Sequence, residues 1–290
     1  GITLDLGYAY ATCDDGTRLG FVDVPGHERL VHNMLAGATG IDFAVLVIAA
    51  DDGPMPQTRE HLEIIDLLGL GRGAVALTKC DLADEDRLAE VEAQIAGLLH
   101  GTTLAGSPVF PVSSVTGAGL DALRAHLAAQ AAATQQRDGR GRFRLAIDRA
   151  FVLKGTGVVV TGTAHSGTVA IDDRLVLSPR GLEVRVRGIH AQNAAAERGA
   201  AGQRCALNLT GAKLDKELVN RGDWLVAPEL HSPTDRLDVQ LRVARHAGRP
   251  LQHWTPVHVH LGAARIIGRV AVLEGDALVP GATGLVQLVL

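Results

Sequence analysis

The chain has 290 residues, of which 47% are hydrophobic and 21% are charged. This composition is typical of a globular chain that buries a core, and it excludes disordered, collagen-like and small disulfide-stapled proteins. The longest uninterrupted apolar run, residues 43–50, is far shorter than the roughly 20 residues that cross a bilayer, and no signal segment opens the sequence. We therefore expect no membrane partner and, with three widely spaced cysteines, a cytoplasmic location.

Charge is divided unevenly along the chain. Residues 1–136 contain 7 Lys and Arg against 18 Asp and Glu, a net charge of −11. Residues 137–290 contain 21 against 14, a net charge of +7. This division predicts two functional halves, of which the basic one is suited to a polyanionic partner.

The first half alternates short apolar runs with amphipathic helical patterns. The apolar runs predict buried strands at 19–22, 43–49, 73–77 and 109–112. The helical spacing of apolar residues predicts helices at 57–68, 84–99 and 120–132. Strands that alternate with helices indicate an α/β domain whose parallel sheet is covered on both faces.

The helical period ends at a polar, glycine-containing linker, residues 134–141. Short strands bounded by Gly, Asp and Pro then predict a small β-barrel. They lie at 143–147, 157–161, 174–177, 184–189, 203–209 and 223–226. After a second break at 228–233, strands are predicted at 237–244, 257–261, 269–273 and 284–290. The predicted domains are residues 1–133, a barrel at 142–228 and part of a second barrel at 234–290.

The strongest chemical signal is Asp23-Val24-Pro25-Gly26-His27, directly after the first predicted strand. A carboxylate at a strand end can hold Mg²⁺ through water. The glycine lets a backbone N–H approach a phosphate, and a polar side chain beyond it can orient an attacking water. Without further signals, an aspartate at a strand end before Pro-Gly more often marks a simple turn than a phosphate-binding site.

Other polar segments lie at suitable distances from it. Thr3 is upstream, and Thr78-Lys79-Cys80-Asp81 follows strand 73–77, where a carboxylate can accept two hydrogen bonds from guanine. Ser113-Ser114 follows strand 109–112. Loops at the carboxyl ends of parallel strands are where such a sheet binds ligands. Order and spacing together favour a nucleotide site over coincidence.

These motifs resemble those of the translational GTPases related to elongation factor Tu, above all at residues 27–28 and 52–61. Residues 3–10, 145–151, 190–193, 202–208 and 220–224 are similar to the bacterial selenocysteine-specific branch of that family. The resemblance covers essentially the whole chain. It implies an α/β P-loop-type GTPase domain, truncated at its N-terminus, followed by all-β barrel domains of the translation-factor type.

By this resemblance the ligands are GTP and Mg²⁺. Thr3 and Asp23 would bind the metal, Gly26 would contact the γ-phosphate, and His27 would position the hydrolytic water. Thr78 stands where most GTPases have asparagine, which weakens the contact with the base. The remaining base-binding residues would be Lys79, stacked along the guanine, Asp81, reading its N1 and N2 groups, and Ser113 and Ser114, bracketing it.

The sequence lacks a phosphate-cradling loop of the form Gly-x-x-x-x-Gly-Lys-[Ser/Thr], since it contains no Gly-Lys dipeptide. In the family that loop precedes the region where this chain begins, and the chain opens at Gly1 without a methionine. We therefore expect a fragment whose parent binds and hydrolyses GTP. The fragment itself is expected to bind GTP weakly or not at all, because the loop supplies most of the electrostatic cradle.

In the basic half, Asp148, Arg149 and Arg204 match family positions that line the pocket for a selenocysteinyl group. A selenol is largely ionised at neutral pH while a serine hydroxyl is not, so two guanidiniums favour the former. Asp148 would hold an arginine in place or meet the aminoacyl amine. The alternative is a surface ion pair on the barrel rim.

The resemblance implies a carrier that delivers selenocysteinyl-tRNA to the ribosome and hydrolyses GTP on decoding. Bacterial members also bind a messenger stem-loop through a C-terminal region that is absent here. One alternative is another aminoacyl- or initiator-tRNA carrier of the elongation factor Tu superfamily, and a second is the GTPase subunit of a sulfate adenylyltransferase. A third, if the missing loop is genuine, is a nucleotide-independent RNA- or ribosome-binding module.

His258 and His260 share a face of a predicted strand, and with His253 nearby the three histidines invite a metal site. No carboxylate or cysteine completes such a site in the sequence nearby, so ordinary strand histidines are favoured.

Overall fold

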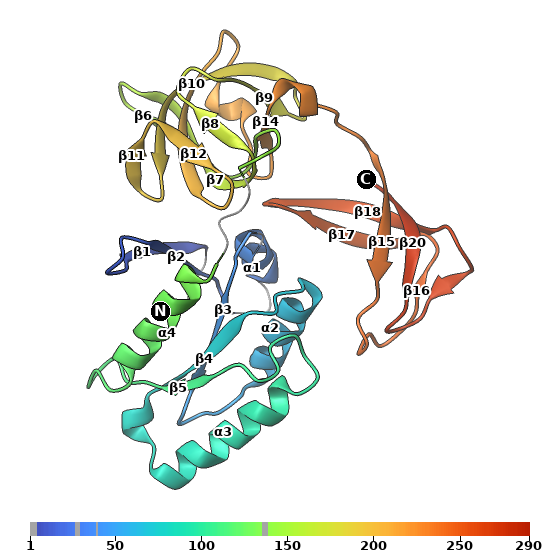
Figure 1. Cartoon of the computed structure of the whole chain (residues 1–290). Helices are drawn as coiled ribbons and strands as arrows, with labels where there is room; N and C mark the ends of the chain where they lie inside the picture. Colours follow the sequence, from blue (N-terminus) through green and yellow to red (C-terminus); the bar gives the residue numbers. More distant parts are fainter. Residues whose placement is uncertain (1–4, 27–29, 39, 135–138) are drawn as a thin grey trace. The chain divides into compact units, whose positions relative to one another are not determined.

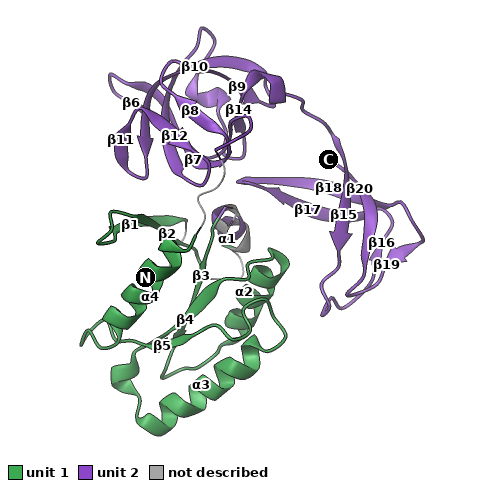
Figure 2. Cartoon of the chain, viewed as in Figure 1, with its two compact units in different colours: residues 1–31, 41–136 green, residues 32–40, 137–290 purple. Residues whose placement is uncertain are grey.

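The computed structural model describes residues 5–26, 30–38, 40–134 and 139–290 (Figure 1). Contacts divide the chain into two units, residues 1–31 with 41–136 and residues 32–40 with 137–290 (Figure 2). The first unit mixes helices with strands. The second consists mainly of strands and includes most of helix α1 (Val31–Ala38). The predicted fold class, α/β followed by all-β, is confirmed.

The first unit is built on a parallel sheet with the strand order β3 (Ala44–Ala49), β4 (Gly73–Thr78), β5 (Val109–Pro111). The middle strand, β4, is buried along nearly its whole length, as its run of small and apolar residues predicts. Three helices accompany the sheet: α2 (Pro56–Leu67), α3 (Glu85–Leu99) and α4 (Leu120–Ala132). Each begins and ends within one residue of its predicted position.

The strand predicted at 19–22 does not belong to this sheet, so that part of the prediction is wrong. It forms β2 (Arg18–Asp23), which pairs in antiparallel register with β1 (Gly7–Thr12). In the tight turn between them, Gly16 has a φ of 83° and the Asp15 carboxylate accepts a 2.8 Å hydrogen bond from the Thr17 N–H. An Asp-Gly turn between two short strands favours a local hairpin, and the prediction overlooked it.

The second unit contains a closed β-barrel. In β13, buried Cys205, Leu207 and Leu209 alternate with half-buried residues, because successive side chains of a strand point to opposite faces. The inward side chains form one apolar core. Six strands make the ring, and they are the six predicted from the sequence. In order they are β10 (Leu182–Ala191), β13 (Arg204–Thr210), β7 (Gly157–Ser166), β6 (Arg144–Leu153), β14 (Trp224–Val226) and β9 (Arg174–Ser178), which pairs again with β10.

Three short strands add to the barrel's edges. Strand β11 (Ala194–Ala196) extends the sheet beside β10, and β8 (Thr168–Ala170) pairs with β12 (Arg198–Ala200).

A four-stranded antiparallel sheet follows, with the order β15 (Arg236–Arg242), β20 (Thr283–Val289), β18 (Ala264–Val272), β17 (Thr255–Leu261). A short pair, β16 (Leu251–Gln252) and β19 (Ala277–Leu278), accompanies it. One face of the sheet covers an apolar core. The strand registers place four exposed arginines on its other face: Arg236, Arg242, Arg265 and Arg269.

Strand β6 carries a bulge where it pairs with β7. Ile147 lies opposite Gly162 and Arg149 lies opposite Thr161, which leaves Asp148 as the extra residue. A bulge changes the direction of the added side chain, and here Ile147 and Asp148 are both buried. A Cβ at Gly162 would overlap the carbonyl oxygen of Ala146. Glycine thus allows β6 and β7 to approach closely beside the bulge.

We expect Gly162→Ala to lower the free energy of unfolding by about 3 kcal/mol, because the added methyl must push β6 away from β7. Gly188→Ala in β10 is the matched control, since its methyl would meet the Cβ of Asn208 at the ordinary distance of 3.8 Å. That control should change stability by less than about 0.5 kcal/mol. Urea denaturation measures both, and equal stabilities would contradict the close approach.

Candidate functional site

Loops from the three parallel strands lie at the carboxyl edge of the first unit's sheet. Asp51 follows β3, Lys79 follows β4 and Ser113 follows β5. The Lys79 Nζ lies 2.7 Å from Oδ2 of Asp51. The Cys80 N–H donates a 3.3 Å hydrogen bond to the carbonyl of Val112, at the end of β5. The structure therefore brings the predicted segments after β4 and β5 together at the edge where such sheets bind ligands.

The loop after β4 begins with an unusual backbone turn. Lys79 has a φ of 57°, in the left-handed region that non-glycine residues seldom adopt, and leads into a short 3₁₀ helix, Cys80–Leu82. Asp81 is exposed on this helix. Thr78 instead donates its hydroxyl to the carbonyl of Ile48 on β3 at 3.2 Å, so its side chain links two strands.

The two serines after β5 have different surroundings. Ser113 is fully buried, and its Oγ accepts hydrogen bonds from the N–H groups of Val115 and Thr116, at 3.2 and 3.1 Å. Such a local bond shapes the loop. Ser114 is exposed, so of the two side chains it is the one open to a ligand.

The motif after β2 is described only in part. Asp23 ends the strand and Gly26 follows, both exposed. The Gly26 carbonyl lies 3.1 Å from Nε2 of His61 on α2, and because a carbonyl can only accept, His61 donates. Sequence reasoning placed His61 in the family resemblance but did not connect it with Gly26. Thr3 and His27 lie outside the described residues.

On the barrel, Asp148 lies at the bulge of β6, and its carboxylate contacts side chains from two other strands. Arg204 of β13 donates to its carboxylate twice, from Nε to Oδ2 at 3.0 Å and from Nη2 to Oδ1 at 2.9 Å. Thr161 of β7 donates its hydroxyl to Oδ1 at 2.5 Å and accepts from Arg204 Nη2 at 2.9 Å. Asp148 is 7% exposed and the Arg204 side chain 18%. The pair is therefore largely buried, which disfavours the surface ion pair considered as the alternative.

Arg149 completes what we call the Asp148 cluster, which consists of Asp148, Arg149, Thr161 and Arg204. Arg149 is exposed and lies opposite Thr161 in the strand ladder. Asp148 and Arg204 carry opposite charges, and Arg149 adds a second guanidinium to the cluster. Sequence reasoning missed Thr161. Its only signal is one hydroxyl at the end of the valine run 158–160.

Four pKa shifts follow from these surroundings. The hydrogen bond from Lys79 lowers the pKa of Asp51 below its ordinary value, and Asp51 in turn raises the pKa of Lys79. In the barrel, burial raises the pKa of the Cys205 thiol to about 11, although Arg204 opposes the shift. Cys205 is therefore a neutral thiol at physiological pH, and its side chain belongs to the core. Burial also raises the pKa of Asp223.

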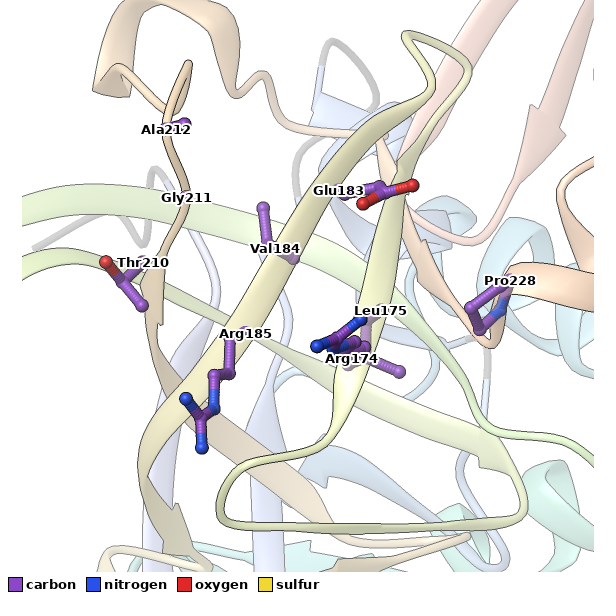
Figure 3. Close-up of a pocket in the computed structure, with 9 residues that line it drawn as sticks. All are labelled: Arg174, Leu175, Glu183, Val184, Arg185, Thr210, Gly211, Ala212 and Pro228. Carbon is purple, nitrogen blue, oxygen red and sulfur yellow. The ribbon is translucent and has the colours of Figure 1, made fainter.

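A hollow of about 540 Å³ lies elsewhere on the barrel (Figure 3). Arg174 and Arg185 lie opposite each other on β9 and β10 and line it, together with Glu183. Arg185 also pairs with Asp172 at 2.9 Å. The charge of Arg185 is thus offset by Asp172, and the lining also contains the Glu183 carboxylate, so we assign the hollow no ligand.

Within the described ranges, no group of three or more His, Cys, Asp and Glu side chains is placed to hold a metal ion. His253 Nδ1 accepts a 3.1 Å hydrogen bond from the Val272 N–H, and His258 Nε2 lies 3.0 Å from Arg265 Nη2. His258 lies on β17, and His253 lies in the turn between β16 and β17. None of the helices that the structure describes has the length and apolar character needed to cross a membrane.

Three known families match successive parts of the chain. "Elongation factor Tu GTP binding domain" matches residues 1–133, and "Elongation factor Tu domain 2" matches residues 157–226. "Selenocysteine-specific elongation factor, beta-barrel domain" matches residues 234–290.

Individual proteins agree with these matches. The chain is 45% identical to a selenocysteine-specific elongation factor of Desulfomicrobium baculatum, over 99% of this chain and 45% of the relative. Identity to the Escherichia coli factor of that name is 48%, over 95% and 44%. Elongation factor Tu 2 of Streptomyces avermitilis is 31% identical, over 98% and 75%. The crystal structure of a bacterial selenocysteine-specific elongation factor aligns with a TM-score of 0.85 and 29% identity, over 99% and 47%. The chain thus spans less than half the length of these selenocysteine-specific relatives.

The contact between Lys79 and Asp51 makes a prediction for pH titration. A lowered carboxylate pKa means that the folded state favours the ionised form. The contribution of the pair to the free energy of unfolding should therefore be present above the ordinary pKa of Asp, and it should be lost as the pH falls through the lowered pKa. In Lys79→Met, the pKa of Asp51 should rise toward its ordinary value, as read by NMR of the side-chain carboxyl. Lys154→Met, in the other unit, is the control. An unchanged Asp51 titration in Lys79→Met would contradict the contact.

Proposed function

The chain belongs to the selenocysteine-specific elongation factors, a branch of the translation factors related to elongation factor Tu. We therefore propose that the complete gene product binds GTP, carries selenocysteinyl-tRNA to the ribosome and hydrolyses the GTP on decoding. The observation that carries the proposal is the buried, bidentate contact of the Arg204 guanidinium with the Asp148 carboxylate, beside the exposed Arg149. The predicted domain limits, 1–133, 142–228 and 234–290, are part of the proposal, as is a cytoplasmic location, where ribosomes work.

Guanine recognition would take place at the loops after β4 and β5. The exposed Asp81 carboxylate suits the N1–H and N2–H donors of guanine, because a carboxylate accepts hydrogen bonds at both oxygens. Lys79 would lie along the base, and its contact with Asp51 orients the side chain in the absence of ligand. Ser113 shapes the loop through its buried Oγ and Ser114 would bracket the base from the other side. With the Thr78 hydroxyl engaged on β3, Asp81 is left to carry most of the specificity.

The phosphates and the metal would lie at the segment after β2. Asp23 and Thr3 provide oxygen donors, which is the ligand type that Mg²⁺ prefers, and the exposed Gly26 offers a backbone N–H to the γ-phosphate. When bound, Mg²⁺ would offset the charge of the phosphate oxygens. His27 would position the attacking water. The bond between Gly26 and His61 supports this arrangement, because it links the segment to α2.

The Asp148 cluster would receive the selenocysteinyl group. The Arg204 guanidinium, which Asp148 orients, and the Arg149 guanidinium beside it would both donate hydrogen bonds to one selenolate. A serine hydroxyl at the same place would gain no charge–charge attraction. The cluster therefore favours selenocysteine over serine through electrostatics, as well as through the planar guanidinium's directed donors.

The remaining contacts with RNA would run through phosphates. The outer face of the sheet formed by β15, β20, β18 and β17 carries four exposed arginines against one aspartate, Asp238, which accepts a 2.9 Å hydrogen bond from Gln287. A basic face of this kind suits a phosphate backbone. The ribosome and a messenger stem-loop are proposed as further partners of the complete gene product.

The guanine site is tested with Asp81→Ala in the complete gene product. GTP should bind more tightly than ITP, which lacks the 2-amino group, and the variant should lose most of this preference, about tenfold or more, because a charged hydrogen bond is removed. Glu85→Ala, a few residues along the chain on α3, is the control. Competition against a fluorescent nucleotide measures both, and an undiminished preference for GTP in Asp81→Ala would rule out the assignment.

The aminoacyl pocket is tested with the double variant Asp148→Asn/Arg204→Ala, which removes both charges and leaves no unpaired buried carboxylate. Its preference for selenocysteinyl-tRNA over the same tRNA carrying serine should fall about tenfold or more. Arg187→Ala, an exposed arginine at the bulge of β10, should leave the preference unchanged. Protection of the aminoacyl ester from hydrolysis gives the affinities. A double variant that discriminates as well as the unaltered protein would refute the pocket.

A further inference from the structure

The hydroxyl of Thr161 forms hydrogen bonds with both charged groups of the Asp148 cluster. It donates to Asp148 Oδ1 at 2.5 Å and accepts from Arg204 Nη2 at 2.9 Å. Arg204 Nη2 also donates to the same Oδ1 at 2.9 Å. One hydroxyl, one carboxylate oxygen and one guanidinium nitrogen therefore form a closed triangle of hydrogen bonds.

The backbone around Thr161 does not require this side chain. Thr161 lies within the ladder between two strands, opposite Arg149 on β6 and Ala206 on β13. Its three predecessors on β7 are Val158, Val159 and Val160. Valine has the shape of threonine without the hydroxyl, so a fourth valine would suit the strand equally well. At this position threonine differs from valine in its hydroxyl, which makes the contacts with Asp148 and Arg204.

The surroundings make that hydroxyl effective. Thr161 is 6% exposed, so water does not compete for its hydrogen bonds, and a bond to a charged group in such a place is worth more than one at the surface. Threonine is also stiff about χ1, because its Cβ is branched. The hydroxyl therefore points in a fixed direction and holds the edge of the guanidinium that carries Nη2.

We propose that Thr161 is a positioning residue of the aminoacyl pocket, which fixes the plane of the Arg204 guanidinium and thereby sharpens the discrimination between a selenolate and a hydroxyl. This inference rests on the proposed function of the Asp148 cluster. The Asp148 carboxylate by itself accepts two hydrogen bonds from Arg204, one from Nε and one from Nη2. Thr161 adds a third bond from another strand, which resists rotation of the guanidinium about the edge formed by Nε and Nη2.

The expected consequence is selective. A ligand anion gains most from a guanidinium whose N–H groups already point at it, whereas a neutral hydroxyl gains little from the same alignment. Loss of the third bond should therefore weaken the binding of selenocysteinyl-tRNA and leave that of seryl-tRNA nearly unchanged. A residue that only supported the barrel would affect both tRNAs alike.

Thr161→Val in the complete gene product, bound to a GTP analogue, tests the inference. The dissociation constant for selenocysteinyl-tRNA should rise about fivefold, while that for the same tRNA carrying serine should change less than about twofold. Thr161→Ser, which keeps the hydroxyl, should restore discrimination. Thr210→Val makes the same substitution on β13, away from the cluster, and should change neither constant. If thermal unfolding shows that Thr161→Val does not fold, Thr161→Ala takes its place.

The outcomes separate this inference from the proposed function. If Asp148→Asn/Arg204→Ala loses discrimination and Thr161→Val keeps it, the pocket stands and the positioning role of Thr161 is refuted. If the double variant also keeps its discrimination, the proposed function of the cluster is refuted as well. Equal weakening of both tRNAs by Thr161→Val would show a purely structural role and overturn the inference.

Discussion

The Asp148 cluster depends on one irregularity of the barrel, the extra residue in β6. Regular alternation already turns Asp148 to the face opposite the core residue Ile147, and it would turn the next residue, Arg149, back toward the core. The bulge instead places Arg149 opposite Thr161, so that Asp148 and Arg149 both lie beside Thr161, whose hydroxyl contacts the Asp148 carboxylate. Gly162 keeps the partner strand close at this point, because any larger residue would meet the Ala146 carbonyl. The chemistry of the site thus follows from a local departure from strand geometry.

Burial of the pair is better explained by recognition than by stability. Removing a carboxylate and a guanidinium from water costs much of what their attraction returns, so a buried pair often contributes little to folding. The geometry does fix the orientation of Arg204, a residue whose head reaches the surface with 18% of its side chain exposed. An arginine held in this way can meet a small anion without first ordering its own side chain. In the proposed pocket, selection between selenium and oxygen would then depend on the charge of the aminoacyl side chain beside Arg204.

Much of this organisation was predictable from the sequence. The six ring strands of the barrel are separated by regular turn signals, and α3 buries the apolar stripe that contains Val91, Ile95 and Leu99, which explains why these elements were predicted closely. The β1–β2 hairpin was missed because its partner strand, Gly7–Thr12, has no apolar run, and only the Asp-Gly turn marks it. Thr161 was missed for a different reason. A single hydroxyl after three valines has no pattern, and its role arises from contacts with residues 13 and 43 positions away.

The central claim is that the pocket recognises charge, and the same tRNA carrying cysteine tests it most directly. A cysteine thiol has an ordinary pKa of about 8.5, so it passes from mostly neutral to half ionised between about pH 7 and 8.5. If the Asp148 cluster selects an anion, the affinity for cysteinyl-tRNA should rise over this range toward that for selenocysteinyl-tRNA, while the affinity for seryl-tRNA stays level. Parallel pH profiles for the cysteinyl and seryl forms would contradict the account.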